Sequence, residues 1–232
     1  MHKYDLIISL GNDYVPAMAL KFLRITEKTY PFDWSNCNGD SSEKLLKKCT
    51  AIKNRFEDEF NIDNFIKYYD TKSFMRSLKN VKTGIYYAQD FTRRQSVKDF
   101  FPEFLEKYQR RIQRLYTDIE NTDNILFLYQ DTTSVPSSHV IKKAINILKA
   151  SFPNKNINLF IFLPLVSTKT TKCYKMKTNV DNVCLFGCTK KWPENSEKRV
   201  ALFANILKNA MNDDFCSFET SDDNACSCSA DI

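Results

Sequence analysis

Four short polar clusters in this 232-residue sequence carry side chains that could take part in chemistry. They contain Ser9, Gly11, Asn12, Asp13 and Tyr14; Phe32, Asp33, Trp34 and Ser35; Gln89 and Asp90; and Gln130, Asp131 and Thr132. The first cluster lies between an apolar segment and a predicted helix. Its backbone N–H groups and the helix dipole can therefore face an anion or a developing oxyanion. The alternative is that Asn12 and Asp13 only cap the helix.

Candidates for acid–base or nucleophilic chemistry are few. The chain has two histidines, of which His2 is terminal and His139 opens a predicted helix. His139 could approach the same site with Cys37 or Cys49 as a partner, although a surface or capping role is the alternative. Ser9, Asp33 and Asp90 have no evident base beside them, which favours structural hydrogen bonding. Trp34 either packs over the pocket or stacks on a substrate, and packing is favoured.

The sequence predicts neither a metal nor a cofactor. Its eight cysteines show no regular spacing, and with no export signal the expectation is reduced thiols. Cys184, Cys188, Cys226 and Cys228 could in principle bind zinc, but the close second pair in an acidic, Ser-rich segment is a poor half-site. Four glycines cannot build a phosphate-binding loop or a dinucleotide fingerprint, and H-E-x-x-H is missing.

Apolar strands alternating with amphipathic helices must position these residues. Strands are predicted at 4–10, 83–87, 124–129, 158–163 and 182–186, and helices at 17–24, 41–60, 97–120, 138–150 and 196–210, with two short helical pieces before Ser77. The basic, Thr-rich stretch 169–177 is predicted to be a loop. This alternation favours a three-layer α/β/α sandwich with a mainly parallel sheet. It also places the loops after Leu10, Tyr87, Tyr129 and Leu163 near one edge, where such folds bind ligands.

The clusters also carry a family resemblance. The segments IISLGNDY, YPFDWS, AQDF, YQRRI and NILFLY follow one another in this order. The chain resembles, over residues 4–165, the uncharacterised family described as putative papain-like cysteine peptidases. That family has the pattern S-L-G-x-x-C, P-F-D-W, H-D-F, K-Y-x-R-R-I and L-F-V-R. The resemblance implies a cysteine–histidine pair and allows a papain-like α+β fold as the alternative architecture.

This sequence departs from the pattern where catalysis would need it. Tyr14 stands at the cysteine position, Gln89 at the histidine position and Tyr129 at the arginine position. A phenol and an amide cannot replace a thiolate and its base. The resemblance therefore implies a catalytically inactive relative that binds a small ligand or a protein, and we expect no enzyme. The first alternative is an active hydrolase or transferase that uses other residues.

Charge and hydropathy bound the remaining possibilities. Residues 1–211 are expected to form one α/β domain with 34 basic and 22 acidic residues, and residues 212–232 a disordered acidic tail. A basic scaffold for nucleic acid or an anionic surface is the second alternative, but the scattered Lys and Arg disfavour it. Without a signal peptide or an apolar run long enough for a membrane span, a cytoplasmic location without membrane association is expected. The Lys-, Asn-, Ile- and Phe-rich composition suits an A+T-rich genome such as a viral one, which would mean host cytoplasm.

Overall fold

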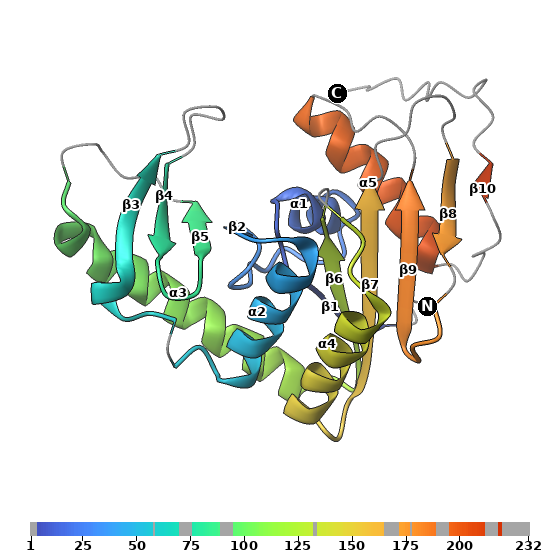
Figure 1. Ribbon diagram of the computed structural model, residues 1–232, viewed down its shortest axis with the longest axis horizontal. Helices are drawn as coiled ribbons and strands as arrows, with labels where there is room; N and C mark the ends of the chain where they lie inside the picture. The colour runs from blue at the N-terminus through green and yellow to red at the C-terminus, as the bar shows by residue number, and fades with distance from the viewer. Residues whose placement is uncertain are drawn as a thin grey trace.

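A mainly parallel sheet, sheet A, is the larger of the two sheets in the described part of the chain and lies on the right in Figure 1. The computed structural model describes residues 4–57, 59–69, 76–88, 95–131, 134–164, 172–176, 178–188, 195–211 and 218–219. Sheet A has the strand order β1-β6-β7-β9-β8-β10. Four strands are parallel, namely β1 (Leu6–Ser9), β6 (Asn124–Gln130), β7 (Asn156–Pro164) and β9 (Val183–Cys188). β8 (Lys172–Met176) and β10 (Phe218–Glu219) are antiparallel to their neighbours.

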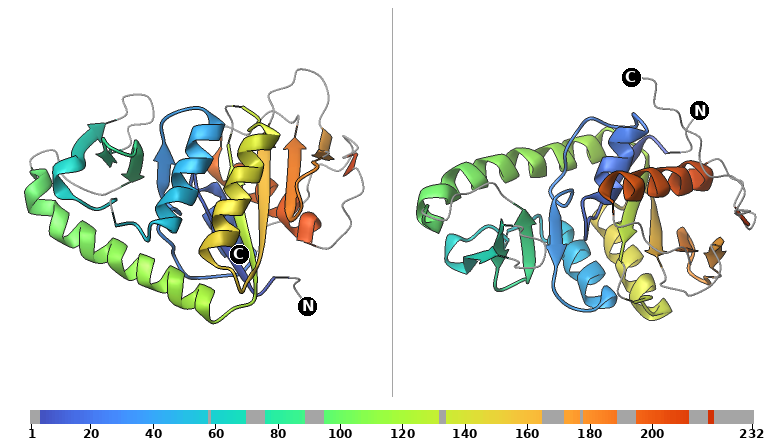
Figure 2. Two further views of the ribbon diagram at one scale, coloured as in Figure 1. Left: turned by 60° about the horizontal axis from the view of Figure 1, so that its bottom comes forward. Right: turned by 90° about the horizontal axis from the view of Figure 1, so that it is seen from above.

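Helices cover both faces of sheet A (Figure 2). α1 (Val15–Phe22) and α5 (Ser196–Met211) pack together on one face, and α2 (Ser41–Lys53) and α4 (Ser138–Ser151) pack together on the other. The apolar run 125–129 within β6 explains this arrangement. Phe127 and Tyr129 join the core below α2 and α4, whereas Leu126 and Leu128 join the core below α1 and α5. The predicted three-layer α/β/α sandwich is thus confirmed.

A second, antiparallel sheet was not predicted. Sheet B has the order β2-β5-β4-β3, with β2 (Ser35–Cys37), β5 (Ile85–Ala88), β4 (Arg76–Asn80) and β3 (Phe65–Tyr69), the last preceded by the 3-10 turn Ile62–Asn64. The strand predicted at 83–87 therefore lies outside the main sheet. Of the two short helical pieces expected before Ser77, the 3-10 turn Ile62–Asn64 is present, β3 occupies Phe65–Tyr69, and residues 70–75 lie outside the described residues. The physical reason is a hairpin in which Gly84 adopts a φ of +75° and lets β4 turn back into β5.

The long helix α3 (Val97–Glu120) has the predicted bounds and connects the two sheets. A capping box starts it, because Ser96 Oγ accepts a hydrogen bond from the Asp99 N–H and Asp99 Oδ2 accepts one from the Ser96 N–H. Phe104 and Tyr108 pack against Tyr87 of sheet B, while Leu115 and Ile119 lie in the same apolar cluster as the core of sheet A. One helix thereby shares its apolar stripe between both sheets.

Two other predicted segments differ from the structure. α2 ends at Lys53 instead of reaching residue 60, because Arg55 and Phe56 adopt left-handed φ values of 51° and 60° that a helix cannot contain. The predicted loop 169–177 contains β8, which pairs with β9. Within the acidic segment 212–232, Phe218–Glu219 forms β10, and the rest lies outside the described residues. Among the described helices, none is both long and apolar enough to cross a membrane.

Candidate functional site

The carboxyl ends of β1 and β6 lie side by side, and the chain leaves them toward opposite faces of sheet A. After β1 it enters α1 on one face, and after β6 it enters α4 on the other. Neighbouring parallel strands with such connections leave a crevice outside their carboxyl ends, where open α/β sheets bind ligands. We call this region the β1–β6 crevice; residues 11–14 follow β1, and Gln130 and Asp131 end and follow β6.

Gly11 brings the first two predicted clusters into contact. Its N–H donates a hydrogen bond to Ser9 Oγ at 3.0 Å, and its φ of +67° is in the left-handed region. A Cβ at this position would lie 2.2 Å from the carbonyl oxygen of Phe32. The next residue, Asn12, also has a positive φ and donates its N–H to the Ser35 carbonyl at 3.3 Å. The loop after β1 therefore fits directly against the P-F-D-W-S turn.

Asp33 holds that turn together from the inside. Its Oδ2 accepts a hydrogen bond from the Tyr30 N–H at 2.8 Å, and Ser35 Oγ donates to the Phe32 carbonyl at 3.0 Å. The Asp33 side chain is buried, and burial raises its pKa to about 7. Arg114 of α3 donates from Nη1 to the Thr29 carbonyl at 2.9 Å, which anchors the start of the turn. These contacts give Asp33 a structural role.

Tyr14 and Trp34 form one wall of this region. Tyr14 is the N-cap residue of α1, and its ring is stacked on Trp34 with centroids 6.2 Å apart and planes at 11°. The Tyr14 N–H donates to Asp13 Oδ1 at 2.5 Å. Because the N-cap residue is Tyr14 and no side chain caps α1, the structure does not support the alternative in which Asn12 and Asp13 only cap the helix. Burial raises the pKa of Asp13. Trp34, from the second cluster, therefore packs against Tyr14 of the first cluster.

Two lysines on α2 face the crevice from the opposite side. Lys44 forms a buried ion pair with Asp131, with Nζ 3.4 Å from Oδ2. The hydroxyl of Tyr129 lies 2.9 Å from the same carboxylate oxygen and 3.0 Å from the carbonyl of Ser41, at the start of α2. Burial and the neighbouring Asp131 carboxylate raise the pKa of Tyr129. Asp131 is thus shared between Lys44 and a neutral phenol.

Lys48, one helical turn after Lys44, has no such partner. Its side chain is fully buried, and its Nζ makes no hydrogen bond within the described part of the chain. The Nζ lies 5.5 Å from the centroid of the Phe32 ring and 3.2 Å from where a Cβ on Gly11 would be. Burial lowers the pKa of Lys48 to about 7, although the charge of Asp131 opposes this shift.

Three further buried polar atoms around the crevice make no hydrogen bond to any described residue. They are Asn12 Oδ1, Ser41 Oγ and Gln130 Oε1. Buried polar atoms are normally satisfied, because leaving one without a partner costs about 1 to 3 kcal/mol. Asn12 follows β1, Gln130 ends β6 and Ser41 begins α2. The unsatisfied atoms therefore come from three elements that meet at one edge of the sheet.

A family model described as putative papain-like cysteine peptidase matches residues 5–162. The chain belongs to this family. The match runs from β1 into β7, so it contains both strands that flank the crevice. Comparisons with curated proteins and with solved structures gave no match.

Of the two catalytic positions implied by the family pattern, the structure describes one. Tyr14 lies at the start of α1, where a helix dipole would lower the pKa of a thiol. Gln89 and Asp90 are outside the described residues, so their distance from Tyr14 stays a prediction. Strand β5 ends just before them, and its Tyr87 pairs with Ser35, the residue after Trp34. The end of β5 thus lies beside the residue that follows Trp34, although β5 belongs to sheet B.

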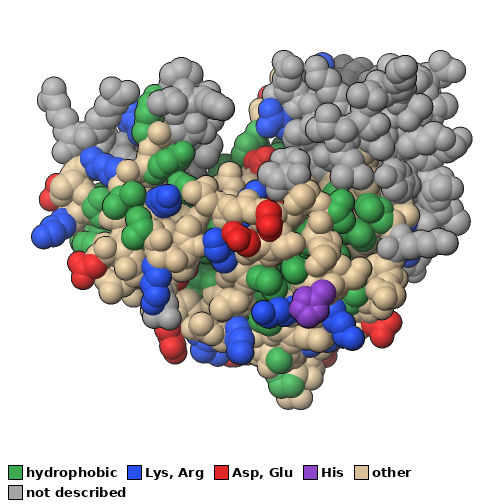
Figure 3. All heavy atoms as spheres, viewed as in Figure 1, with side chains coloured by type: hydrophobic (Ala, Val, Ile, Leu, Met, Phe, Trp, Pro, Cys, Tyr) green, Lys and Arg blue, Asp and Glu red, His purple; other side chains and the backbone are tan. Residues whose placement is uncertain are grey.

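The remaining thiol and imidazole candidates are not arranged as a catalytic pair among the described residues. Cys37 and Cys49 are both buried. Burial raises the pKa of Cys37, and raises that of Cys49 to about 12, so both thiols are protonated at neutral pH. His139 is exposed on α4 (Figure 3), and His2 lies outside the described residues. Cys184 and Cys188 lie on β9, while Cys226 and Cys228 are not described.

Sequence reasoning missed Lys44 and Lys48. It predicted a helix over residues 41–60 without singling out these two lysines, whose side chains are buried. A signal was present, because Leu45, Cys49 and Ile52 form an apolar stripe on α2 and both lysines directly precede members of it. A lysine inside the arc of an apolar stripe is either buried or covers that stripe with its methylene chain. Only packing against sheet A decides between the two.

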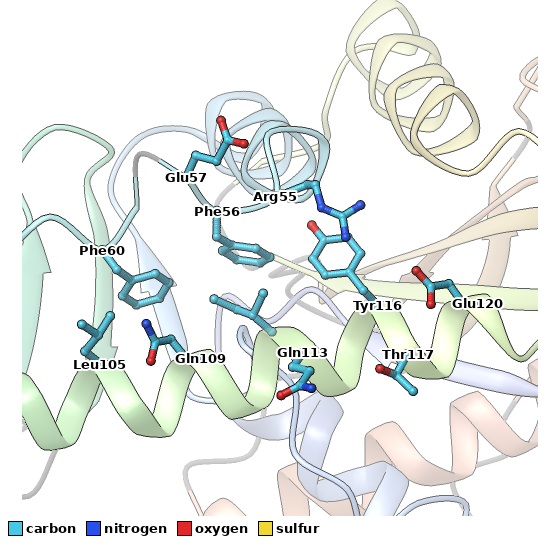
Figure 4. A pocket seen from close by; sticks show the side chains of 11 residues that line it. Arg55, Phe56, Glu57, Phe60, Leu105, Gln109, Gln113, Tyr116, Thr117 and Glu120 are labelled. Atoms are coloured by element: carbon cyan, nitrogen blue, oxygen red, sulfur yellow. The ribbon is translucent and has the colours of Figure 1, made fainter.

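A groove with a volume of about 690 Å³ lies elsewhere in the molecule. It runs between α3 and the segment after α2 (Figure 4). Phe56, Phe60 and Tyr116 contribute aromatic rings, and the Arg55 guanidinium lies 4.4 Å from the centroid of the Tyr116 ring. None of the residues that border the β1–β6 crevice lines this groove. The sheet-edge site is the stronger candidate because it combines the family positions with unsatisfied buried groups.

Proposed function

We propose that the protein is a catalytically inactive member of its family, which retains the β1–β6 crevice to bind a small ligand or a partner protein. The observation that carries this proposal is the stack of Tyr14 on Trp34 at the N-terminus of α1. At the place where the family pattern has its nucleophile, this chain has a phenol whose ring is packed against a neighbour. A phenol cannot supply the thiolate on which a cysteine nucleophile depends.

The surrounding groups support binding rather than bond cleavage. Ser9 Oγ is occupied by the Gly11 N–H, and Asp33 is occupied by the Tyr30 N–H. Neither has a base of suitable pKa among its described hydrogen-bond partners. The unsatisfied atoms of Asn12, Ser41 and Lys48 can serve instead as contacts for a bound group.

Labelling with broad thiol-directed and serine-directed activity probes tests the proposal. We expect no stoichiometric labelling of Cys37 or Cys49 in the folded protein at neutral pH, because burial keeps both of these thiols protonated. The matched comparison is the urea-unfolded protein, in which the same cysteines become reactive and show that the probe works. Stoichiometric labelling of one residue in the folded protein, lost when that residue is substituted, would establish an active hydrolase or transferase that uses other residues.

A further inference from the structure

The buried groups around Lys48 leave one positive charge without a counter-charge. The titratable groups that interact with Lys48 are Lys44 and Cys49 of α2, Cys37 of β2, Asp131 after β6, and Asp13 in the loop after β1. Asp131 is already paired with Lys44, and both thiols are protonated. Asp13 is committed to the Tyr14 N–H. A buried ammonium without a partner is costly, so this arrangement favours either a neutral amine or a bound anion.

Gly11 lets the backbone approach the amine closely. A Cβ on Gly11 would lie 3.2 Å from Lys48 Nζ and 2.2 Å from the Phe32 carbonyl oxygen, and both Gly11 and Asn12 adopt positive φ values. Asn12 Oδ1 and Ser41 Oγ are buried and have no described partner. An asparagine amide can present its NH₂ group after a flip, and a serine hydroxyl can donate, so both can accompany the ammonium as donors.

We propose that the β1–β6 crevice binds the oxyanion of a small ligand, a carboxylate or a phosphate ester, through the ammonium group of Lys48. This inference rests on the proposed binding function and names the ligand class of that site. The anion replaces the missing counter-charge of Lys48, while Lys44 stays paired with Asp131. Charge-assisted hydrogen bonds of this kind are about twice as strong as neutral ones.

Titration calorimetry with sulfate and with acetate, at constant ionic strength in chloride buffer, tests the proposal. Sulfate represents a phosphate ester and acetate a carboxylate, and neither changes charge between pH 6 and 8. Because burial lowers the pKa of Lys48 to about 7, the free amine loses its charge across this range. We expect saturable binding at pH 6 that is about tenfold weaker at pH 8. The anion that binds more tightly identifies the ligand class.

Lys48→Met is the decisive variant, and Lys47→Met is its matched control. Lys47 is the adjacent residue and is partly exposed, and Lys47→Met removes the same charge as Lys48→Met. We expect Lys48→Met to abolish binding and Lys47→Met to retain it within about twofold, since exposed charges contribute little. Should Lys48→Met fail to fold, the pH dependence of the unmodified protein decides the matter. Binding that is unchanged from pH 6 to 8, or no saturation by either anion at pH 6, overturns the proposal without affecting the activity-probe result.

Discussion

Gly11 determines how closely the loop after β1 can approach the P-F-D-W-S turn. Its backbone lies against the Phe32 carbonyl in a conformation that side chains disfavour. The S-L-G motif at this point of the sequence therefore has a structural explanation that is independent of catalysis. Any residue with a Cβ would have to move the turn that carries Asp33 and Trp34.

Gly11→Ala is expected to destabilise the protein by about 3 kcal/mol, the sum of left-handed strain and overpacking. Gly84→Ala is the matched control, because Gly84 has a φ of +75° but the nearest atom beyond its chain neighbours, Lys47 Nζ, lies 3.5 Å from the added Cβ. It should cost about 1 kcal/mol. Urea unfolding gives both values. Equal losses in the two variants would mean that the contact with Phe32 carries no energy.

Lys48 links stability to pH. Burial lowers its pKa from 10.5 to about 7. Between these two pH values the unfolded chain therefore binds a proton at Lys48 that the folded protein lacks. The contribution of Lys48 to the free energy of unfolding accordingly becomes more favourable as the pH rises through this range. Lys48→Met lacks this dependence. The difference in the free energy of unfolding between Lys48→Met and the unmodified protein should therefore change by about 2 kcal/mol from pH 6 to 8.5, in favour of the unmodified protein.

Urea unfolding in chloride buffer at the two pH values measures this difference. The comparison with Lys48→Met at each pH cancels the titration of the buried cysteines and tyrosines, which both proteins share. Lys47→Met serves as the control and should follow the unmodified protein. A constant difference between Lys48→Met and the unmodified protein would show that Lys48 keeps its ordinary pKa.

Tyr14 and Gln89 allow the family positions to be restored. Tyr14→Cys places a thiol at the N-terminus of α1, and adding Gln89→His should supply an imidazole that lowers the pKa of this thiol further. Alkylation rates measured against pH should show a more reactive thiol in the double variant than in Tyr14→Cys alone, and than Cys37 or Cys49. An unshifted profile in the double variant would mean that position 89 lies too far from Tyr14.

At the scale of elements, α3 was predicted with its correct bounds, whereas β3 and β4 were missed. The 24 residues of α3 repeat their apolar positions over several turns, a pattern that no strand produces. β3 and β4 have five residues each and mix aromatic, polar and basic side chains, so their periodicity is too short to identify. The positions of β3 and β4 are determined by strand pairing and by packing against the aromatic side chains of α3, and both are tertiary contacts.

Substitution of Phe104 tests how strongly the packing between α3 and sheet B stabilises the protein. Phe104 is fully buried between Phe65, Tyr87 and Tyr108, so Phe104→Ala should cost about 3 to 5 kcal/mol. Phe22→Ala on α1 is the control, because 63% of Phe22 is exposed, and should change stability by less than about 0.5 kcal/mol. Chemical unfolding followed by circular dichroism measures both. Similar small losses would mean that the aromatic cluster rearranges to fill the space.

At the scale of the whole molecule, the site combines positions that sequence could and could not predict. The alternation of strands and helices predicted the carboxyl edge, and the family pattern predicted Tyr14, Asp33 and Trp34 near it. It could not predict that Lys48 is buried there, because a lysine on an amphipathic helix normally faces solvent. Nor could it predict sheet B, whose β2 and β5 bring residues 35–37 beside residues 85–87.

The shared apolar stripe of α3 has a consequence for how the protein unfolds. A single buried cluster includes Phe65 and Tyr87 of sheet B together with Phe127 and Ile161 of sheet A. Separating the sheets would expose rings along a rod about 36 Å long. We therefore expect one calorimetric transition, in which the van't Hoff and calorimetric enthalpies agree. Two resolved transitions would show that sheet B melts as an independent cooperative unit.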